Sequence, residues 1–505
     1  MKKILFALLF LVSTVALAAC NDTATDPVET PVDTPVDTPV ETPVETPVDS
    51  DPGKTYDIDI DTLDLGGKII SYYTHVSTED NPFAEGYVGT DKEAYQTFLT
   101  NLQQTYNFTL SFKGWTDYNN RITDIASHVL GGGGSAIVRS PELEFMLDLI
   151  SAGYLSNITH VANALKDEYA VNDWQVQAGT VQDNVFAIQN KDGVEYVELL
   201  VYNKTLMTAA GIEKTPTQRW IDGEWTLDTM GDYLNQLRLE YGNSPYPMAI
   251  TPYHIAMYGP AANGSQFVTS EGNLNLLNTA TFDVIYKYKD WYDYGYIRPM
   301  NFNMGYILKH SIANAWANQD SVFGVAMMWQ LEGFAQNVSF EYGIVPFPQA
   351  DGKTKDDYYT AINPGDLQMV TIGNDADEVA TIMFLINEFH KERREEELQT
   401  CLTNNPEATA VECQAIENVQ KYLRLSNEID IAQAEEVFSF LQGTLEYNSI
   451  RSNDLAYLNG EILYVQAVQD YFQSGGSPRN YIDAIIPQIN ENIRRMLDAI
   501  ASSLS

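Results

Sequence analysis

Polar and aromatic side chains lie where several predicted strands end. Tyr73 and His75 come at the end of the first predicted strand, Arg139 ends the third, and Asn363 and Asp366 lie in a Pro-Gly turn after a later strand. Because open α/β sheets bind ligands beyond the carboxyl ends of their strands, these residues are candidate ligand contacts. Rings, amides and charged groups of this kind could stack on a polar solute and hydrogen-bond it. The alternatives are a surface ion pair for Arg139 and a plain turn for the last two.

Nothing in the sequence points to catalysis. It contains no nucleophile elbow, no His-Glu-x-x-His pair and no glycine-rich dinucleotide fingerprint with a matching acid. The 6 His are scattered, and 69 acidic residues would supply a pair of carboxylates by accident. The four glycines from Gly131 to Gly134 follow a helix and precede no Gly-Lys-Ser/Thr, so they predict a loop and not a phosphate cradle. We expect a binding protein and not an enzyme, with no cofactor and no metal.

The first residues of the chain predict export and a lipid anchor. Lys2 and Lys3 precede an apolar run over residues 4–12, as in a signal peptide, which we place at residues 1–19. Leu-Ala-Ala-Cys20 follows, and it resembles the lipobox of bacterial lipoproteins, in which the Cys is lipidated. Residues 20–53 then repeat Pro-Val-Asp/Glu-Thr, a composition typical of a solvated, semi-rigid spacer.

Composition limits the partners of the remaining residues, 54–505. The net charge of −40 argues against nucleic acid as a partner. About 450 residues are too many for one compact core and suit two lobes. Cys401 and Cys413 flank a polar loop and could close it as a disulfide in an oxidising exterior. Metal binding by these two thiols is the alternative, which the absence of a nearby His disfavours.

The hydrophobic pattern predicts an α/β protein with a helical C-terminal part. Strands and helices alternate in the first part of this region, which is typical of a parallel α/β lobe. The expected strands there are 68–74, 107–113 and 136–138, and the expected helices are 91–106, 117–130 and 141–150. Residues 185–188 and 195–201 predict a hairpin, 321–329 and 342–348 predict strands, and the pattern is almost wholly helical from residue 376.

Several sequence patches occur in the order of a known family. They are Tyr202-Asn-Lys-Thr-Leu with Ala210-Gly-Ile, Val325-Ala-Met-Met, Tyr342-Gly-Ile-Val-Pro-Phe-Pro and Gln473-Ser-Gly-Gly-Ser-Pro-Arg. Together they resemble the extracellular solute-binding proteins, family 1, of ABC importers, the class that includes maltose-binding protein. The resemblance spans most of residues 66–500. We expect Tyr202 and Asn203 to support the fold.

The resemblance implies two lobes, each a mostly parallel sheet flanked by helices, joined by a hinge. Lobe 1 would take roughly residues 66–170 plus a later return segment. Lobe 2 would take roughly 171–370, with a helical C-terminal part over 376–505. Closure of two such lobes on a ligand is a common binding mechanism.

The resemblance also implies a function. Trp329 is similar in position to a stacking aromatic of the family; its alternative is a core residue. The expected protein is a monomer, lipid-anchored through Cys20 at the outer face of the bacterial membrane. It would bind a sugar or oligosaccharide and deliver it to ABC permease subunits. The alternatives are a non-sugar solute (a peptide, polyamine or phosphorylated polyol), or a surface carbohydrate-active enzyme or adhesin.

Overall fold

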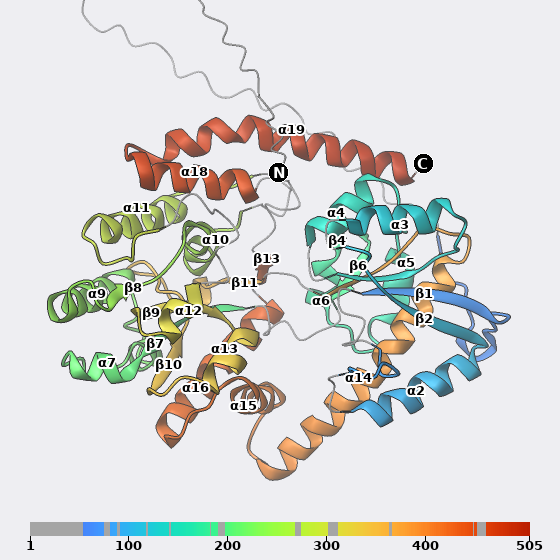
Figure 1. Cartoon of the computed structure of the whole chain (residues 1–505), viewed down its shortest axis with the longest axis horizontal. Helices are drawn as coiled ribbons and strands as arrows, with labels where there is room; N and C mark the ends of the chain where they lie inside the picture. Colours follow the sequence, from blue (N-terminus) through green and yellow to red (C-terminus); the bar gives the residue numbers. More distant parts are fainter. Residues whose placement is uncertain are drawn as a thin grey trace, which may run out of the picture. The chain divides into compact units, whose positions relative to one another are not determined.

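A computed structural model describes twelve segments of the chain (Figure 1). They are residues 54–74, 81–87, 91–117, 120–140, 143–181, 183–189, 197–267, 274–300, 312–362, 366–447, 449–451 and 461–504. The signal peptide, the spacer and three predicted site residues (Cys20, His75 and Asn363) lie outside the described residues.

Five strands form the first sheet, in the order β2-β1-β3-β12-β6. They are β1 (Lys68–Thr74), β2 (Phe108–Gly114), β3 (Ile137–Ser140), β6 (Ala187–Gln189) and β12 (Leu367–Val370). β1 is rich in β-branched and aromatic residues, is buried over its last five positions and pairs in parallel with β2 and β3. β12 pairs antiparallel with β3 and β6. Four of these five described strands therefore run in the same direction, and β12 runs against them. In this sense the sheet is mostly parallel, as predicted.

Helices cover both faces of this sheet (Figure 1). They are α2 (Lys92–Thr105), α3 (Arg121–Leu130), α4 (Leu143–Ser151), α5 (Thr159–Leu165), α6 (Asp173–Ala178) and α14 (Ala376–Asn404). Apolar residues of α2, α5 and α14 are buried together on one face. Residues of α3 and α4 are buried on the other face. Both faces are covered, as a parallel sheet requires.

Four strands form the second sheet, in the order β10-β7-β9-β8. They are β7 (Glu198–Asn203), β8 (Tyr246–Met248), β9 (Ser321–Met327) and β10 (Tyr342–Val345). β7 runs antiparallel to β9 and β10, whereas β8 and β9 are parallel. β9 is buried at every position. A Cβ at Gly324 would lie 2.6 Å from Cβ of the fully buried Trp316, so the strand needs glycine there.

Helices surround the second sheet, and three of the family-like patches include residues of its strands β7, β9 and β10. These helices are α7 (Lys204–Ala209), α8 (Pro216–Ile221), α9 (Leu227–Tyr241), α10 (Pro252–Ala262), α11 (Thr279–Asp293), α12 (Ile312–Ala317) and α13 (Met328–Ala335). Asn203 caps α7, because its Oδ1 accepts from the backbone N–H of Leu206 at 2.9 Å. The buried hydroxyl of Tyr202 is hydrogen-bonded to Thr217, which donates to the carbonyl of Ile344. Both residues support the fold, as predicted.

The two sheets exchange strands in a way that the sequence pattern did not predict. Residues 185–201 do not form the predicted hairpin, because β6 belongs to the first sheet and β7 to the second. β6 and β12 also fall inside the range predicted for lobe 2, but they belong to the first sheet, where β12 pairs with both β3 and β6. The apolar content of a strand shows that it is buried, and it carries no information about which sheet buries it.

The remainder of the chain is mostly helical, as predicted. Its long helices are α15 (Ala410–Tyr422), α16 (Glu428–Tyr447), α18 (Glu461–Ser474) and α19 (Pro478–Leu504). Shorter elements of the chain are η1 (Ile60–Thr62), β4 (Thr180–Val181), β5 (Asn184–Val185), η5 (Lys355–Asp357), β11 (Thr360–Ile362) and β13 (Ser449–Arg451). None of the helices in the described segments is long and apolar enough to cross a membrane.

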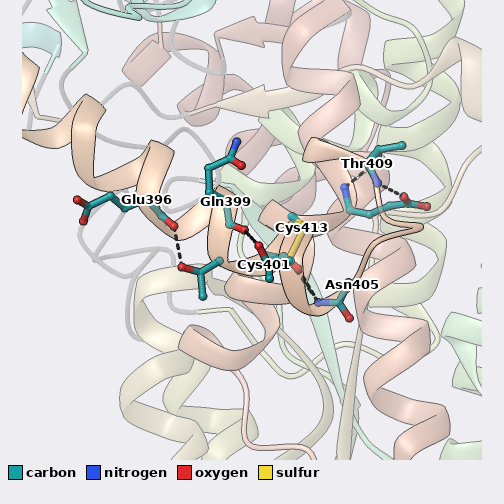
Figure 2. The surroundings of a disulfide bond; sticks show 9 residues. Glu396, Gln399, Cys401, Asn405, Thr409 and Cys413 are labelled. Atoms are coloured by element: carbon teal, nitrogen blue, oxygen red, sulfur yellow. Dashed lines mark hydrogen bonds between the residues drawn. A yellow bond between two sulfur atoms is a disulfide. The ribbon is translucent and has the colours of Figure 1, made fainter.

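A disulfide joins the end of α14 to α15 (Figure 2). Cys401 and Cys413 lie 5.7 Å apart between Cα atoms, and both are buried. On one side, the side-chain amide of Asn405 donates to the carbonyl of Cys401 at 3.1 Å. On the other, Thr409 caps α15, and its Oγ1 accepts from the backbone N–H of Glu412 at 3.2 Å. The bridge closes a short turn between two helices, the arrangement that the spacing of the two cysteines allowed.

Removing this bridge should destabilise the protein. For the Cys401→Ser/Cys413→Ser double variant we expect the free energy of unfolding to fall by about 3 kcal/mol, because the unfolded chain regains the freedom of a roughly 13-residue loop. Urea unfolding with and without a reductant measures this. The reductant should lower the stability of the wild-type protein and leave the double variant unchanged. Equal stability of the two proteins without reductant would contradict the expectation.

His390, on α14, is a partly buried histidine in an electropositive setting. Its ring lies 5.8 Å from the ring of Tyr95 between centroids. Burial, together with neighbouring positive charge, lowers the pKa of His390 to about 4. The charged groups that act on it are Arg394, Arg139 and Arg393, which lower the pKa, and Asp91, which raises it. The folded protein therefore keeps this ring neutral in mildly acidic solution.

A pH dependence of stability follows from this pKa. Below about pH 6.5 the unfolded chain binds a proton at His390, whereas the folded protein does not until about pH 4. Protonation of His390 in the unfolded chain therefore lowers the free energy of unfolding progressively as the pH falls from 6.5 toward 4. Between pH 7 and pH 5 the wild-type protein should lose about 2 kcal/mol more than the His390→Phe variant in urea unfolding. Parallel pH profiles of the two proteins would contradict the assignment.

Candidate functional site

The candidate site consists of one edge of each sheet. In the first sheet, Ser140 at the end of β3 and Gln189 at the end of β6 both pair with Leu367 at the start of β12. In the second sheet, Met327 at the end of β9 pairs with Glu198 at the start of β7. At each edge, the carboxyl ends of parallel strands therefore lie beside the first residue of a strand that follows, along the chain, from the other sheet. Such edges are where open α/β sheets bind ligands.

Tyr73, the first predicted contact, is packed into the core. Its ring stacks on Trp115 at 5.5 Å and meets His128 edge-on at 5.6 Å. Lys113 Nζ lies 5.3 Å from the ring centroid, and burial raises the pKa of the Tyr73 hydroxyl. A binding role for Tyr73 stays a prediction. The partly exposed ring at this place is Trp115, which the sequence analysis missed although it directly follows β2.

Arg139 and Asp366, predicted separately, lie together. Arg139 Nη2 is 3.0 Å from Asp366 Oδ1, and both side chains are mostly buried. Asp366 has a φ of 52°, a left-handed conformation that Asp tolerates better than most residues. The ion pair ties β3 to the residue before β12. The alternative weighed for Arg139 was an ion pair at the surface; the ion pair is present, but it is mostly buried. A direct ligand contact stays a prediction for both residues.

Trp329 is the predicted residue with the most open setting. It is the second residue of α13, directly beyond the end of β9, and it is 48% exposed. Its indole N–H donates to the sulfur of Met327 at 3.1 Å. Gln330 Oε1 accepts from the backbone N–H of Met327 at 3.0 Å, which fixes the turn from β9 into α13. Trp329 is therefore not a core residue, and the edge of the second sheet presents a flat aromatic face.

A buried polar cluster lies at the same edge of the second sheet. His254 Nε2 is 2.9 Å from Glu198 Oε2, and the two side chains are only 1% and 2% exposed. His254 Nδ1 is 2.7 Å from the Oγ1 of Thr251, the residue that caps α10. Sequence analysis did not single out these residues, because nothing in the spacing between positions 198 and 254 indicates a contact.

The described residues show no preformed metal site. No group of three or more His, Cys, Asp or Glu side chains in these segments is arranged to hold a metal ion. Among the described residues, the two edges present one exposed indole, one partly exposed indole and two pairs of polar side chains in contact, Arg139 with Asp366 and Glu198 with His254. This combination can bind a polar solute by stacking and hydrogen bonding.

Comparison with solved structures identifies the fold. An ABC substrate-binding protein from Listeria monocytogenes in complex with cycloalternan shares 13% identity at a TM-score of 0.53, with 85% of this chain and 99% of that chain covered. A cyclic alpha-maltosyl-1,6-maltose binding protein from Arthrobacter globiformis shares 15% identity at 0.53, with 87% and 99% covered. UgpB from Mycobacterium tuberculosis, in complex with glycerophosphocholine, shares 13% identity at 0.52, with 85% and 99% covered.

Comparisons of the sequence itself found no match. No protein-family model matches the chain, and no curated protein matches it. At these identities the similarity shows the fold alone. It agrees with the two sheets and with strands β7 and β12, each of which follows along the chain from the other sheet. The described chain has the two-lobed α/β fold of ABC substrate-binding proteins.

Proposed function

We propose that this protein is a lipid-anchored, extracytoplasmic substrate-binding protein of an ABC importer. It holds a sugar or oligosaccharide between its two lobes and delivers it to the permease. The observation that carries the proposal is the exposed indole of Trp329 at the edge of the second sheet, in a chain with this fold. The leader sequence and Cys20 support export and anchoring.

The physical character of the edges favours a neutral ligand. The apolar face of a sugar ring stacks well on an indole, and hydroxyls accept and donate hydrogen bonds at the rim. Two pairs of side chains at the described edges are in contact with each other, Arg139 with Asp366 and Glu198 with His254. An ionic solute would have to compete with those pairs, whereas a sugar leaves them intact.

A phosphorylated polyol is the second candidate ligand. The structure of UgpB in complex with glycerophosphocholine resembles this chain about as closely as the sugar-binding structures do. The fold therefore supports both solute classes. Arg121 at the first edge, with Nη1 3.5 Å from the Ser140 hydroxyl and its guanidinium 4.8 Å from the Phe145 ring centroid, is a described cation beside which a phosphate could bind.

A thermal-shift screen of the purified protein distinguishes the two classes. A solute that binds only the folded state adds about 2.7 kcal/mol of stability at 100 times its Kd and so raises Tm. The proposal predicts that at least one oligosaccharide raises Tm and is recovered unchanged afterwards. A rise in Tm with glycerophosphodiesters alone would favour a phosphorylated polyol as the ligand. Hydrolysis of the oligosaccharide would instead favour a carbohydrate-active enzyme, and no response to any solute would favour an adhesin.

Lipid anchoring has its own test. In cells that express the protein and are fed a labelled fatty acid, the label should enter the wild-type protein and not the Cys20→Ser variant. Equal labelling of the two proteins would contradict attachment at Cys20.

A further inference from the structure

A methionine lies where the chain passes from β9 into α13. Met327 is the last residue of β9 and directly precedes the first residue of α13. Ser, Thr, Asp and Asn are preferred at such a position, because their side-chain oxygens accept hydrogen bonds from the first turn of the helix. A thioether sulfur is only a weak acceptor. Helix capping alone therefore does not favour the residue that the sequence has at this turn.

The packing around Met327 restricts its side chain. The residue is only 3% exposed, and its backbone N–H donates to Oε1 of Gln330 at 3.0 Å. Met327 also pairs with Glu198 across the antiparallel strands β9 and β7, so these two side chains lie on the same face of the sheet. Glu198 is itself held by His254 at 2.9 Å. The strand pairing and the turn together limit the positions that the sulfur can take.

The sulfur of Met327 accepts a hydrogen bond from Trp329, the exposed aromatic residue of this edge. The indole nitrogen and the sulfur are 3.1 Å apart, although Trp329 is 48% exposed. An indole has a single N–H donor. While this donor is bonded to Met327, the indole offers a solute its faces and its carbon edges. The hydrogen bond also fixes the rotation of the ring, because the N–H must stay directed at the sulfur.

We propose that Met327 is a positioning residue for solute binding, which holds the indole of Trp329 with its N–H turned toward the protein and the orientation of its ring fixed. The proposal rests on the proposed function, in which Trp329 is the stacking ring. A ring that is already fixed loses little rotational freedom when a solute binds, so more of the stacking energy appears as affinity. Recognition at this edge then depends on the apolar face of a sugar and not on a hydrogen bond from the indole.

Two neighbouring methionines give a matched pair of variants. Met327→Leu keeps a buried apolar side chain of similar volume but removes the sulfur acceptor. Met328→Leu makes the same change at the next residue, which is also buried, and leaves the sulfur of Met327 in place. Met327→Gln supplies a different acceptor on a side chain of similar length and should restore the orientation of the ring. Thermal melting establishes that each protein is folded.

Nitrogen-15 NMR of the indole groups tests the orientation without any ligand. The chain has 7 Trp, and the indole signal that is missing from the Trp329→Phe protein is that of Trp329. In the Met327→Leu protein we expect this signal to shift and its N–H to exchange with solvent about fivefold faster than in the wild-type and Met328→Leu proteins. An unchanged signal and exchange rate in the Met327→Leu protein would overturn the proposal. So would exchange in the wild-type protein as fast as in free tryptophan.

Calorimetric titration with the oligosaccharide that raises Tm then measures the effect on binding. We expect about fivefold weaker affinity in the Met327→Leu protein, wild-type affinity in the Met328→Leu protein and recovery in the Met327→Gln protein. Equal affinities of the two leucine variants would overturn the proposal while leaving the importer function in place. If no sugar binds the wild-type protein, the proposed function fails, and the exchange of the indole N–H still decides whether Met327 orients Trp329.

Discussion

Replacing Trp329 by alanine should weaken binding of the transported sugar by roughly 30-fold while leaving the fold intact. The indole is 48% exposed, so its loss costs little folding energy, but it removes the described aromatic face at the edge of the second sheet. Truncation of a central aromatic contact typically costs about 2 kcal/mol or more of binding free energy. Calorimetric titration with the sugar that raises Tm measures the change directly.

Two further variants make this prediction specific. Trp329→Phe keeps a stacking ring and should recover most of the affinity. Tyr294→Ala removes another exposed aromatic, 65% exposed after the end of α11, and should bind the sugar like the wild-type protein. If Trp329→Ala and Tyr294→Ala have the same affinity as the wild-type protein, Trp329 does not contact the ligand.

Replacing His254 by leucine should destabilise the protein by about 3–5 kcal/mol. The imidazole is the group that faces the Glu198 carboxylate at 2.9 Å, and both side chains are almost fully buried. Removing it leaves a carboxylate in the interior without this partner, which costs far more than the loss of the contact itself. Urea unfolding at neutral pH measures the change.

The double variant Glu198→Leu/His254→Leu separates the pair from the packing around it. With both polar groups gone, most of the stability should return, because no buried carboxylate is left uncompensated. A double-mutant cycle would then show strong coupling between positions 198 and 254. Additive losses in the cycle would show that the contact contributes little.

Local pattern was enough to locate most elements of the first lobe. The predicted strand 68–74 is β1, and the predicted helix 91–106 is α2 to within one residue at each end. Alternating and helical periodicities report which face of an element is buried, so elements with a strong pattern are found well. The predicted strand 321–329 ran two residues too far, because Gln330 caps a helix that starts at Met328.

Contacts between distant parts of the chain could not be predicted. Arg139 and Asp366 form one ion pair although 226 residues separate them, and each was interpreted alone. β6 and β7 lie close in sequence but belong to different sheets, since a strand pairs with whichever edge the topology brings to it. Trp115 was within reach of sequence reasoning, because it follows a strand that had been recognised.

The central claim is that the two lobes close on a sugar, and small-angle X-ray scattering tests it most directly. The purified protein is measured with and without the oligosaccharide that raises its Tm, and the Trp329→Ala variant serves as the control. Closure predicts that saturating sugar lowers the radius of gyration of the wild-type protein, and that the same concentration has a smaller effect on the variant. A radius of gyration that does not change when the sugar is bound would contradict the claim.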